Sequence, residues 1–297
     1  MTTDVRVAGD LDERVPLPEG LAGSPGRTAF VLGGGGSLGA TQVGMLKALL
    51  ESGVRPDLIV GTSIGALNGA YLAGHPDLEG MSSLGALWSS VRRPDVFRIN
   101  VRSLLEGFLG RRDHLFEALG LRRVIGQAEL GFTRLEEAPL PVHVVATDLV
   151  TGAAVVLSEG DATEALMASS AIPGIFPPVT IGGRMLVDGG VLANLPVSQA
   201  IDLGATRVYV LPAMADGVGS LPSGAIDMMQ RSMMIATAAL AQRDLDEARG
   251  CAEVHILPVP TAAQLSMFDF GETPVLMEGA YLAAAAWLRE SERELVP

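Results

Sequence analysis

The stretch Gly-Thr-Ser-Ile-Gly at residues 61–65 decides the fold class of this chain. An apolar run at 58–60 precedes it, and a helix-forming run at 66–72 follows. This order predicts a buried strand, a tight turn at Ser63 and a helix, and the flanking glycines Gly61 and Gly65 permit a strained backbone at the turn. A serine held in this way stands clear of the sheet, beside helix N–H groups that can stabilise an oxyanion. The stretch therefore predicts the nucleophile of a serine acyl hydrolase.

Strand and helix patterns alternate along the chain on both sides of this turn. Apolar runs predict further strands at 28–32, 141–147, 153–157, 185–187, 207–211 and 254–258. Longer patterns predict helices at 41–51, 64–73, 161–169, 228–247 and 274–290. Such alternation is typical of a three-layer α/β fold, in which helices cover both faces of a central, mostly parallel sheet.

Two segments depart from this alternation. Residues 1–26 are rich in proline, glycine and acidic residues and predict a flexible leader before a single domain at 27–297. Residues 77–138 form an insertion that holds nine of the 21 basic residues, all arginines: Arg92, Arg93, Arg98, Arg102, Arg111, Arg112, Arg122, Arg123 and Arg134. Solvated faces of amphipathic helices explain such a segment, and so does a lid-like or interface element that meets an anionic headgroup.

A second glycine-rich turn, at residues 33–39, allows two interpretations. Gly34, Gly36 and Gly39 satisfy the spacing of a dinucleotide-binding loop, but that site also needs an acidic residue at the end of the second strand. Asp57 lies before that strand instead. We therefore favour an oxyanion loop, in which the N–H groups of Gly34, Gly35 and Gly36, together with that of Ile64, face a tetrahedral intermediate.

The serine also needs a general base, and Asp188 is the main candidate. It follows the predicted strand 185–187, and the turn formed by Gly189 and Gly190 presents it at a strand end, as Ser63 is presented. A desolvated carboxylate can accept a hydroxyl proton directly. Among the four histidines, only His255 follows Asp188 in the chain, so a Ser-Asp-His triad remains the alternative. Asn194 is expected to cap the helix after this turn.

Composition narrows the range of functions. The net charge of −13 argues against a nucleic-acid partner. Cys251 is the only cysteine, and the N-terminus lacks a secretory signal, so we expect a cytoplasmic protein with at most peripheral membrane contact. No apolar run has the length of a transmembrane helix, and no cluster of residues has metal-ligand spacing. We therefore expect neither a metal nor another cofactor.

Taken together, these motifs resemble those of the bacterial patatin-like phospholipases. The similarity lies in the glycine loop with its helix at 33–49, the turn at 61–65, the Asp-Gly-Gly turn at 188–190 and the stretch ASSAIPGIFPP at 168–178, in the family's order. The resemblance implies a Ser-Asp dyad without histidine and hydrolysis of lipid acyl esters, including phospholipids, lysophospholipids or neutral esters. A non-catalytic lipid-binding protein of the same fold is the further alternative. Leu38 stands where many members of the family have arginine.

Overall fold

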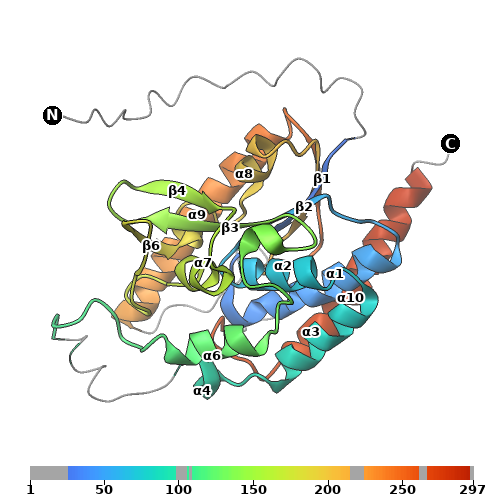
Figure 1. Ribbon diagram of the computed structural model, residues 1–297. Helices are drawn as coiled ribbons and strands as arrows, with labels where there is room; N and C mark the ends of the chain where they lie inside the picture. Colours follow the sequence, from blue (N-terminus) through green and yellow to red (C-terminus); the bar gives the residue numbers. More distant parts are fainter. Residues whose placement is uncertain (1–25, 98–105, 107–108, 215–223, 261–265, 295–297) are drawn as a thin grey trace, which may run out of the picture.

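The computed structural model describes residues 26–97, 106, 109–214, 224–260 and 266–294 (Figure 1). Its centre is one eight-stranded sheet in the order β5-β6-β3-β2-β1-β7-β8, with β4 also paired to β3. The strands are β1 (Thr28–Leu32), β2 (Leu58–Thr62), β3 (Val142–Asp148), β4 (Ala153–Leu157), β5 (Val179–Ile181), β6 (Arg184–Asp188), β7 (Arg207–Leu211) and β8 (Glu253–Ile256).

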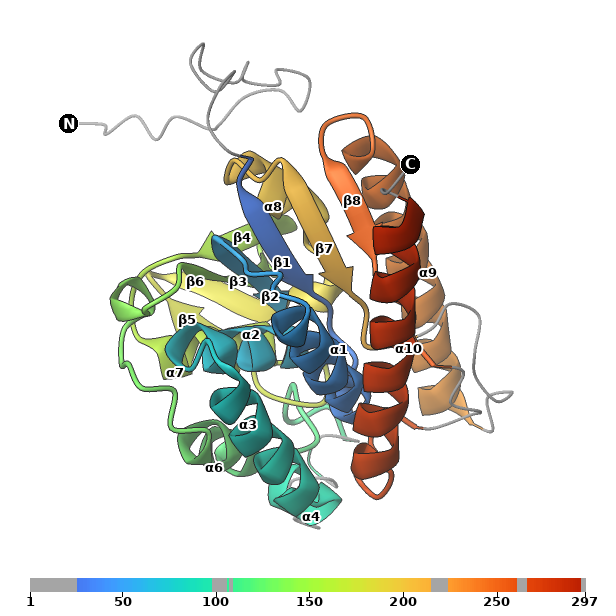
Figure 2. The same ribbon diagram turned by 90° about the vertical axis from the view of Figure 1, so that its right-hand side faces the viewer.

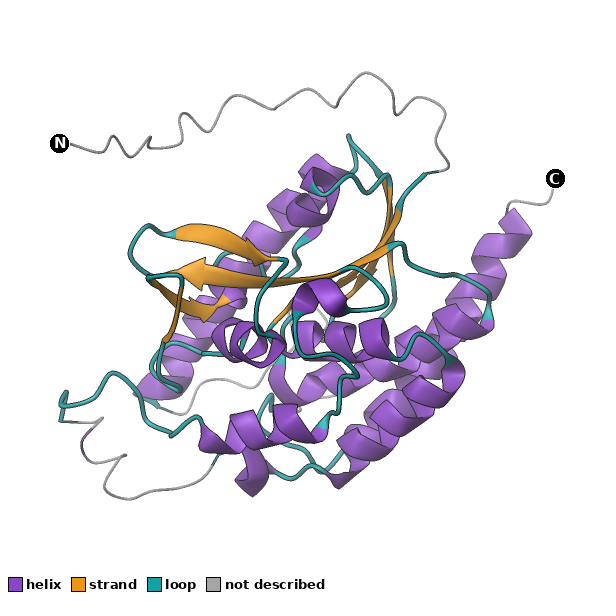
Figure 3. Cartoon of the chain, in the orientation of Figure 1, coloured by secondary structure: helices purple, strands orange, loops and turns teal. Residues whose placement is uncertain are grey.

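Five neighbouring strands, β3, β2, β1, β7 and β8 in their order across the sheet, are parallel. The strands β4, β5 and β6 add antiparallel pairings on the side of β3. Helices, purple in Figure 3, cover both faces of the sheet, whose strands are orange. The expected three-layer α/β fold with a mostly parallel sheet is therefore confirmed. The strand β5 was not anticipated from the sequence.

Alternating side chains of β1 explain why the sheet needs cover on both faces. Phe30 and Leu32 belong to the larger apolar core, whereas Ala29 and Val31 belong to a second core on the opposite face. The helices that contribute to the larger core include α1 (Ala40–Glu51), α2 (Ile64–Gly74), α3 (Leu78–Ser90), α7 (Ala162–Ser169) and α10 (Thr273–Glu294). The second core is closed by α8 (Val197–Asp202) and α9 (Ala225–Ala248), which lie across the sheet from α1 and α2 (Figures 1 and 2).

The expected insertion at 77–138 contains α3, α4 (Arg93–Val96) and α6 (Leu119–Gln127). Several of its arginines form ion pairs: Arg112 with Glu106 and Glu117, Arg122 with Glu164, and Arg134 with Glu136. Arg98 and Arg102 lie outside the described residues, as does nearly all of the expected leader at 1–26. Within the described ranges, no helix combines the length and the apolar character needed to cross a bilayer.

Candidate active site

Ser63 occupies a sharp turn between β2 and α2. Its backbone angles are φ 54° and ψ −124°, a positive-φ conformation that residues other than glycine rarely adopt. Gly65 is required there, because a Cβ at that position would lie 2.3 Å from the carbonyl oxygen of Leu32. Gly61 is similarly restricted, since its Cβ would lie 2.5 Å from the Cα of Ala66. The turn holds the Ser63 hydroxyl at the end of the sheet, as the sequence predicted.

Asp188 reaches Ser63 from the end of β6. The Ser63 Oγ donates a hydrogen bond of 2.6 Å to Asp188 Oδ2, across 125 residues of sequence. The other carboxylate oxygen, Oδ1, accepts a 2.7 Å bond from the N–H of Gly190. Gly189 lets the chain turn against β3, because a Cβ there would lie 2.3 Å from the carbonyl oxygen of Val145. The structure thus brings together the two side chains that the sequence analysis proposed.

Burial alters the acidity of the Asp188 carboxyl group. Ser63 is 8% exposed and Asp188 is 6% exposed, so both lie largely outside bulk water. Desolvation raises the pKa of Asp188 to about 6, although the hydrogen bonds from Ser63 and Gly190 act in the opposite direction. A carboxylate with this pKa is ionised at neutral pH and is a stronger base than an exposed aspartate.

Ser169, at the end of α7, fixes the backbone of the turn. Its Oγ accepts a 2.8 Å hydrogen bond from the N–H of Ser63 and donates a 2.6 Å bond to the carbonyl oxygen of Val145. Ser169 is fully buried, so both bonds are shielded from water. The sequence analysis quoted this residue within the stretch at 168–178 but gave it no role. Its contact with Ser63 depends on how α7 packs, which no local pattern reveals.

Replacing Ser169 with alanine should therefore misplace the nucleophile. We expect kcat to fall about 10- to 100-fold with little change in KM, because the N–H of Ser63 loses its buried acceptor. The free energy of unfolding should also fall by about 1–3 kcal/mol. Ester kinetics and thermal unfolding measure both effects. Ser52→Ala, which removes a hydroxyl bonded to Leu49 at the end of α1, is the matched control. Equal kcat values for the two variants would contradict this role.

The glycine loop lies beside Ser63, but its amides are not equivalent. The N–H of Gly34 donates to the carbonyl oxygen of Asn194 at 3.2 Å, so this amide, which we expected to face an oxyanion, is already engaged. Among the described residues, no hydrogen bond occupies the N–H groups of Gly35, Gly36 or Ile64. Gly34 is instead a place of close approach, since a Cβ there would lie 3.3 Å from that of Ser63.

Asn194 does not have the capping role expected from the sequence. The helix α8 begins at Val197, Pro196 occupies the cap position, and no side chain caps the helix. The reason is the intervening Leu195-Pro196 pair, which places Asn194 two residues before the cap. Its backbone carbonyl joins the glycine loop to the segment after Asp188 through the bond to Gly34. Asn194 thus supports the site through its main chain.

The alternatives based on other residues find less support in the geometry. The direct bond between Ser63 and Asp188 leaves no histidine between them. His255 stacks on Tyr209 and contacts Glu253 at 2.8 Å, and it lines neither of the two cavities at Ser63. Asp57 accepts a 2.7 Å bond from the N–H of Thr28, at the start of β1. It therefore lies at the opposite end of the strands from the glycine loop, where a dinucleotide ribose could not reach it.

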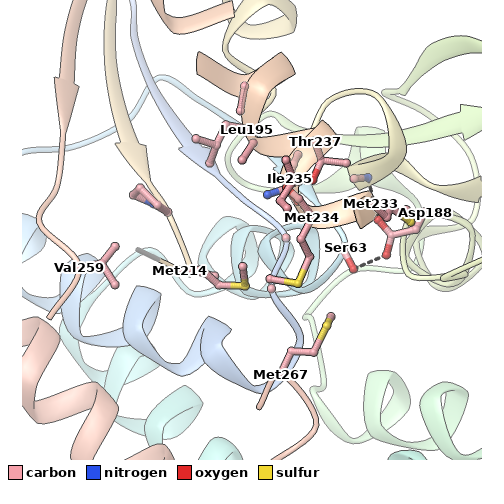
Figure 4. A pocket seen from close by; sticks show the side chains of 18 of the residues that line it. Ser63, Asp188, Leu195, Met214, Met233, Met234, Ile235, Thr237, Val259 and Met267 are labelled. Atoms are coloured by element: carbon pink, nitrogen blue, oxygen red, sulfur yellow. Dashed lines mark hydrogen bonds between the residues drawn. The ribbon is translucent and has the colours of Figure 1, made fainter. Parts of the chain in front are cut away.

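Two cavities meet at Ser63. The wide cavity, of about 400 Å³, extends over Asp188 toward α9 and β8. Figure 4 shows its methionine side chains gathered beside the Ser63–Asp188 pair: Met214, Met233, Met234 and Met267. The narrow pocket, of about 80 Å³, lies on the other side of Ser63, among α2, α3 and α6. A substrate can thus approach the hydroxyl with one part in each space.

Comparisons with known proteins agree with these motifs. The family model described as patatin-like phospholipase matches residues 30–201. An uncharacterized NTE family protein of Mycobacterium tuberculosis is 32% identical over 196 residues, which are 64% of this chain and 51% of that protein. Lysophospholipase NTE1 of Pyricularia oryzae is 30% identical over 192 residues, which are 65% of this chain and 12% of that protein.

The chain thus spans about half the length of the mycobacterial relatives that it matches. Among solved structures, the crystal structure of VipD from Legionella pneumophila aligns over 90% of this chain and 67% of the VipD chain, with a TM-score of 0.49 and 14% identity.

Proposed function

This chain belongs to the patatin-like phospholipase family, and on that premise we propose that it hydrolyses acyl esters of lipids through an acyl-enzyme on Ser63. The 2.6 Å hydrogen bond between Ser63 Oγ and Asp188 Oδ2, at the junction of two cavities, carries the proposal. Phospholipids, lysophospholipids and neutral esters all offer the acyl carbonyl that this chemistry requires. Exposed apolar side chains on α9, at Met228, Met229 and Ile235, support peripheral contact with a lipid surface.

Acylation begins when the Ser63 oxygen attacks the ester carbonyl carbon and its proton passes to Asp188. The negative charge then moves to the carbonyl oxygen, and the N–H groups of Gly35, Gly36 and Ile64 stabilise it, helped by the N-terminus of α2. Collapse of this intermediate breaks the bond to the alcohol, which takes the proton from Asp188. Leu38 replaces the arginine found in many members of the family but leaves these backbone donors intact.

Deacylation repeats the sequence with water as the nucleophile. Asp188, ionised again, accepts a proton from the water as the water oxygen attacks the acyl carbon. The second tetrahedral intermediate uses the same N–H donors. The bond to Ser63 Oγ then breaks, Asp188 returns the proton to the serine, and the fatty acid leaves. One carboxylate thus serves both halves of the reaction.

The proposal is tested by reaction of the full chain with an alkyl fluorophosphonate, followed by mass spectrometry of the modified peptide. We expect one modification, on Ser63, together with hydrolysis of p-nitrophenyl acyl esters. A protein that binds acyl chains without catalysis would neither react with the probe nor release p-nitrophenol. Modification of a different serine, with Ser63 unmodified, would also reject the proposed nucleophile.

His255 provides the test between a dyad and a triad. In the proposed mechanism, His255→Ala retains ester hydrolysis within about threefold of the unmodified enzyme, because Ser63 already donates to Asp188. A triad predicts a loss of about 10⁴-fold or more on the same substitution. Circular dichroism shows whether the variant is folded, and His143→Ala, at another strand histidine, is a matched control. A folded but inactive His255→Ala enzyme would favour the triad.

The pH dependence should follow the ionisation of Asp188. Since burial raises the pKa of this carboxyl to about 6, we expect kcat/KM for an uncharged ester to level off above pH 7 and to fall about tenfold per pH unit below 6. A histidine base also titrates near this range, so the profile is measured again in His255→Ala and should be unchanged. Undiminished activity at pH 4.5 would exclude Asp188 as the base.

A further inference from the structure

The narrow pocket at Ser63 is lined almost entirely by carbon. Its walls come from α2, α3, α4, α6 and the segments before α10, and its apolar lining includes Ile64, Leu67, Leu84, Leu87, Leu121 and Phe176. Trp88 also lines it, but its indole N–H already donates to Asn68 Oδ1 at 2.9 Å. The ring therefore presents no unsatisfied donor to an occupant. Only an apolar group gains by entering such a space.

The wide cavity has a different chemistry. Apolar side chains line most of it, and Arg231, Thr237 and Gln242 on α9 add polar groups. Thr237 donates to the carbonyl oxygen of Met234 at 3.1 Å, and Gln242 donates to Asp246 at 2.9 Å. The wide cavity can therefore hold apolar and polar groups alike, whereas the oxygen atoms of an alcohol or headgroup would find no hydrogen-bond partners in the narrow pocket. The two spaces thus differ in the part of an ester that each accommodates.

The candidate oxyanion donors lie between the two spaces. Gly35 lines the wide cavity, Gly36 and Ile64 line the narrow pocket, and Ser63 lines both. A carbonyl carbon attacked by Ser63 must lie at this junction, with its oxygen toward the amides. Its two substituents, the acyl chain and the alcohol oxygen, then extend in opposite directions, one into each space.

We propose that the narrow pocket holds the acyl chain of the scissile ester and the wide cavity holds the alcohol part, so that α3 and α6 determine acyl chain length. The inference rests on the proposed function and specifies the substrate orientation in that site. It gives the insertion at 77–138 a direct part in selectivity, because α3 and α6 belong to it. In Figures 1 and 2, α3, α4 and α6 lie together at the end of the molecule below α2.

Leu121→Trp tests this orientation. Leu121 lines the narrow pocket from α6 and is only partly buried, so a larger side chain can fill the pocket without entering the main core. The substrates are p-nitrophenyl esters of two to twelve carbons, which differ in the acyl chain alone. We expect kcat/KM for the two-carbon ester to stay within about threefold and that for the longest esters to fall at least tenfold, since each buried methylene contributes about fourfold.

Two further variants serve as controls. Leu119→Trp places the same residue on α6 at a side chain that is 66% exposed and lines neither cavity, so its chain-length profile should match that of the unmodified enzyme. Met234→Trp fills the wide cavity from α9 and should lower turnover of all the esters by a similar factor. If Leu121→Trp does not fold, Leu121→Ala enlarges the pocket and should raise the relative turnover of branched acyl esters.

The outcomes separate this inference from the proposed function. A shortened profile in Met234→Trp, with an unchanged profile in Leu121→Trp, would reverse the orientation and overturn the inference while leaving the hydrolase intact. A uniform loss in folded Leu121→Trp would overturn it as well. If the unmodified enzyme hydrolyses none of the esters and Ser63 does not react with a fluorophosphonate, the proposed function fails and the inference falls with it.

Discussion

Ser63→Ala is expected to lower kcat/KM for a p-nitrophenyl acyl ester by at least about 10⁴-fold, because the substitution removes the hydroxyl that forms the proposed acyl-enzyme. The hydroxyl is the one that donates to Asp188, and the loss removes both the nucleophile and the proton that the base receives. Binding of the ester should persist, since both cavities keep their apolar lining. Steady-state kinetics with active-site titration measure the loss.

A folding check and two further variants serve as controls for this experiment. Alanine inherits the unusual backbone of residue 63, with φ 54°, so its fold is checked by circular dichroism. Ser63→Gly relieves that strain, since glycine adopts positive φ readily, and should be as stable as the unmodified protein and equally inactive. Ser52→Ala, on a surface turn, should retain full activity. Turnover within tenfold of the original in either folded Ser63 variant would refute the acyl-enzyme on Ser63.

The catalytic pair was predictable from sequence because each member lies in a short turn with a strict backbone requirement. Residue 65 must be glycine, because a Cβ there would clash with the carbonyl oxygen of Leu32. Residue 189 must be glycine for the same reason, since its Cβ would clash with the carbonyl oxygen of Val145. Such constraints leave a local signature in the sequence. The meeting of the pair depends on strand register: β6 runs antiparallel to β3 and places Asp188 opposite Ala146, one residue beyond the Val145 that pairs with Thr62 of β2.

The parts that sequence reasoning missed depend on contacts between distant segments. Ser169 binds the Ser63 amide because α7 packs against the sheet, and an isolated Ser-Ser pair gives no sign of that. Gly34 looked like the other loop glycines, yet its N–H is taken by the carbonyl of Asn194, 160 positions later. The narrow pocket likewise combines side chains from several helices, so its shape follows from packing alone.

Asp188→Asn should abolish turnover and, at the same time, stabilise the folded protein at alkaline pH. The amide cannot accept the Ser63 proton, so we expect a loss of at least about 10⁴-fold in kcat. The amide is nearly the same size as the carboxyl and can still bond to Ser63 and to the N–H of Gly190. The substitution therefore removes the charge while leaving the packing in place.

The expected stabilisation follows from the pKa of Asp188. Burial raises it to about 6 in the folded protein, whereas an aspartate in an unfolded chain titrates near about 3.9. Between these values the folded protein holds a proton that the unfolded chain has released, so the free energy of unfolding falls as the pH rises from about 4 to about 6. Above that range the full penalty, roughly 1–3 kcal/mol, persists.

Asparagine carries no charge to bury, so the variant escapes this penalty. Its melting temperature should exceed that of the unmodified protein at pH 8, and most of the difference should disappear near pH 4, where Asp188 is protonated in the folded protein and about half protonated in the unfolded chain. Asp148→Asn is a matched control, since hydrogen bonds from the backbone at Thr151 and Val150 lower the pKa of that carboxyl. Its removal should destabilise the protein at pH 8. Asp188→Asn could instead destabilise the protein by the same amount at both pH values. That result would show that burial does not raise the pKa of Asp188, and another cause would be needed for its strength as a base.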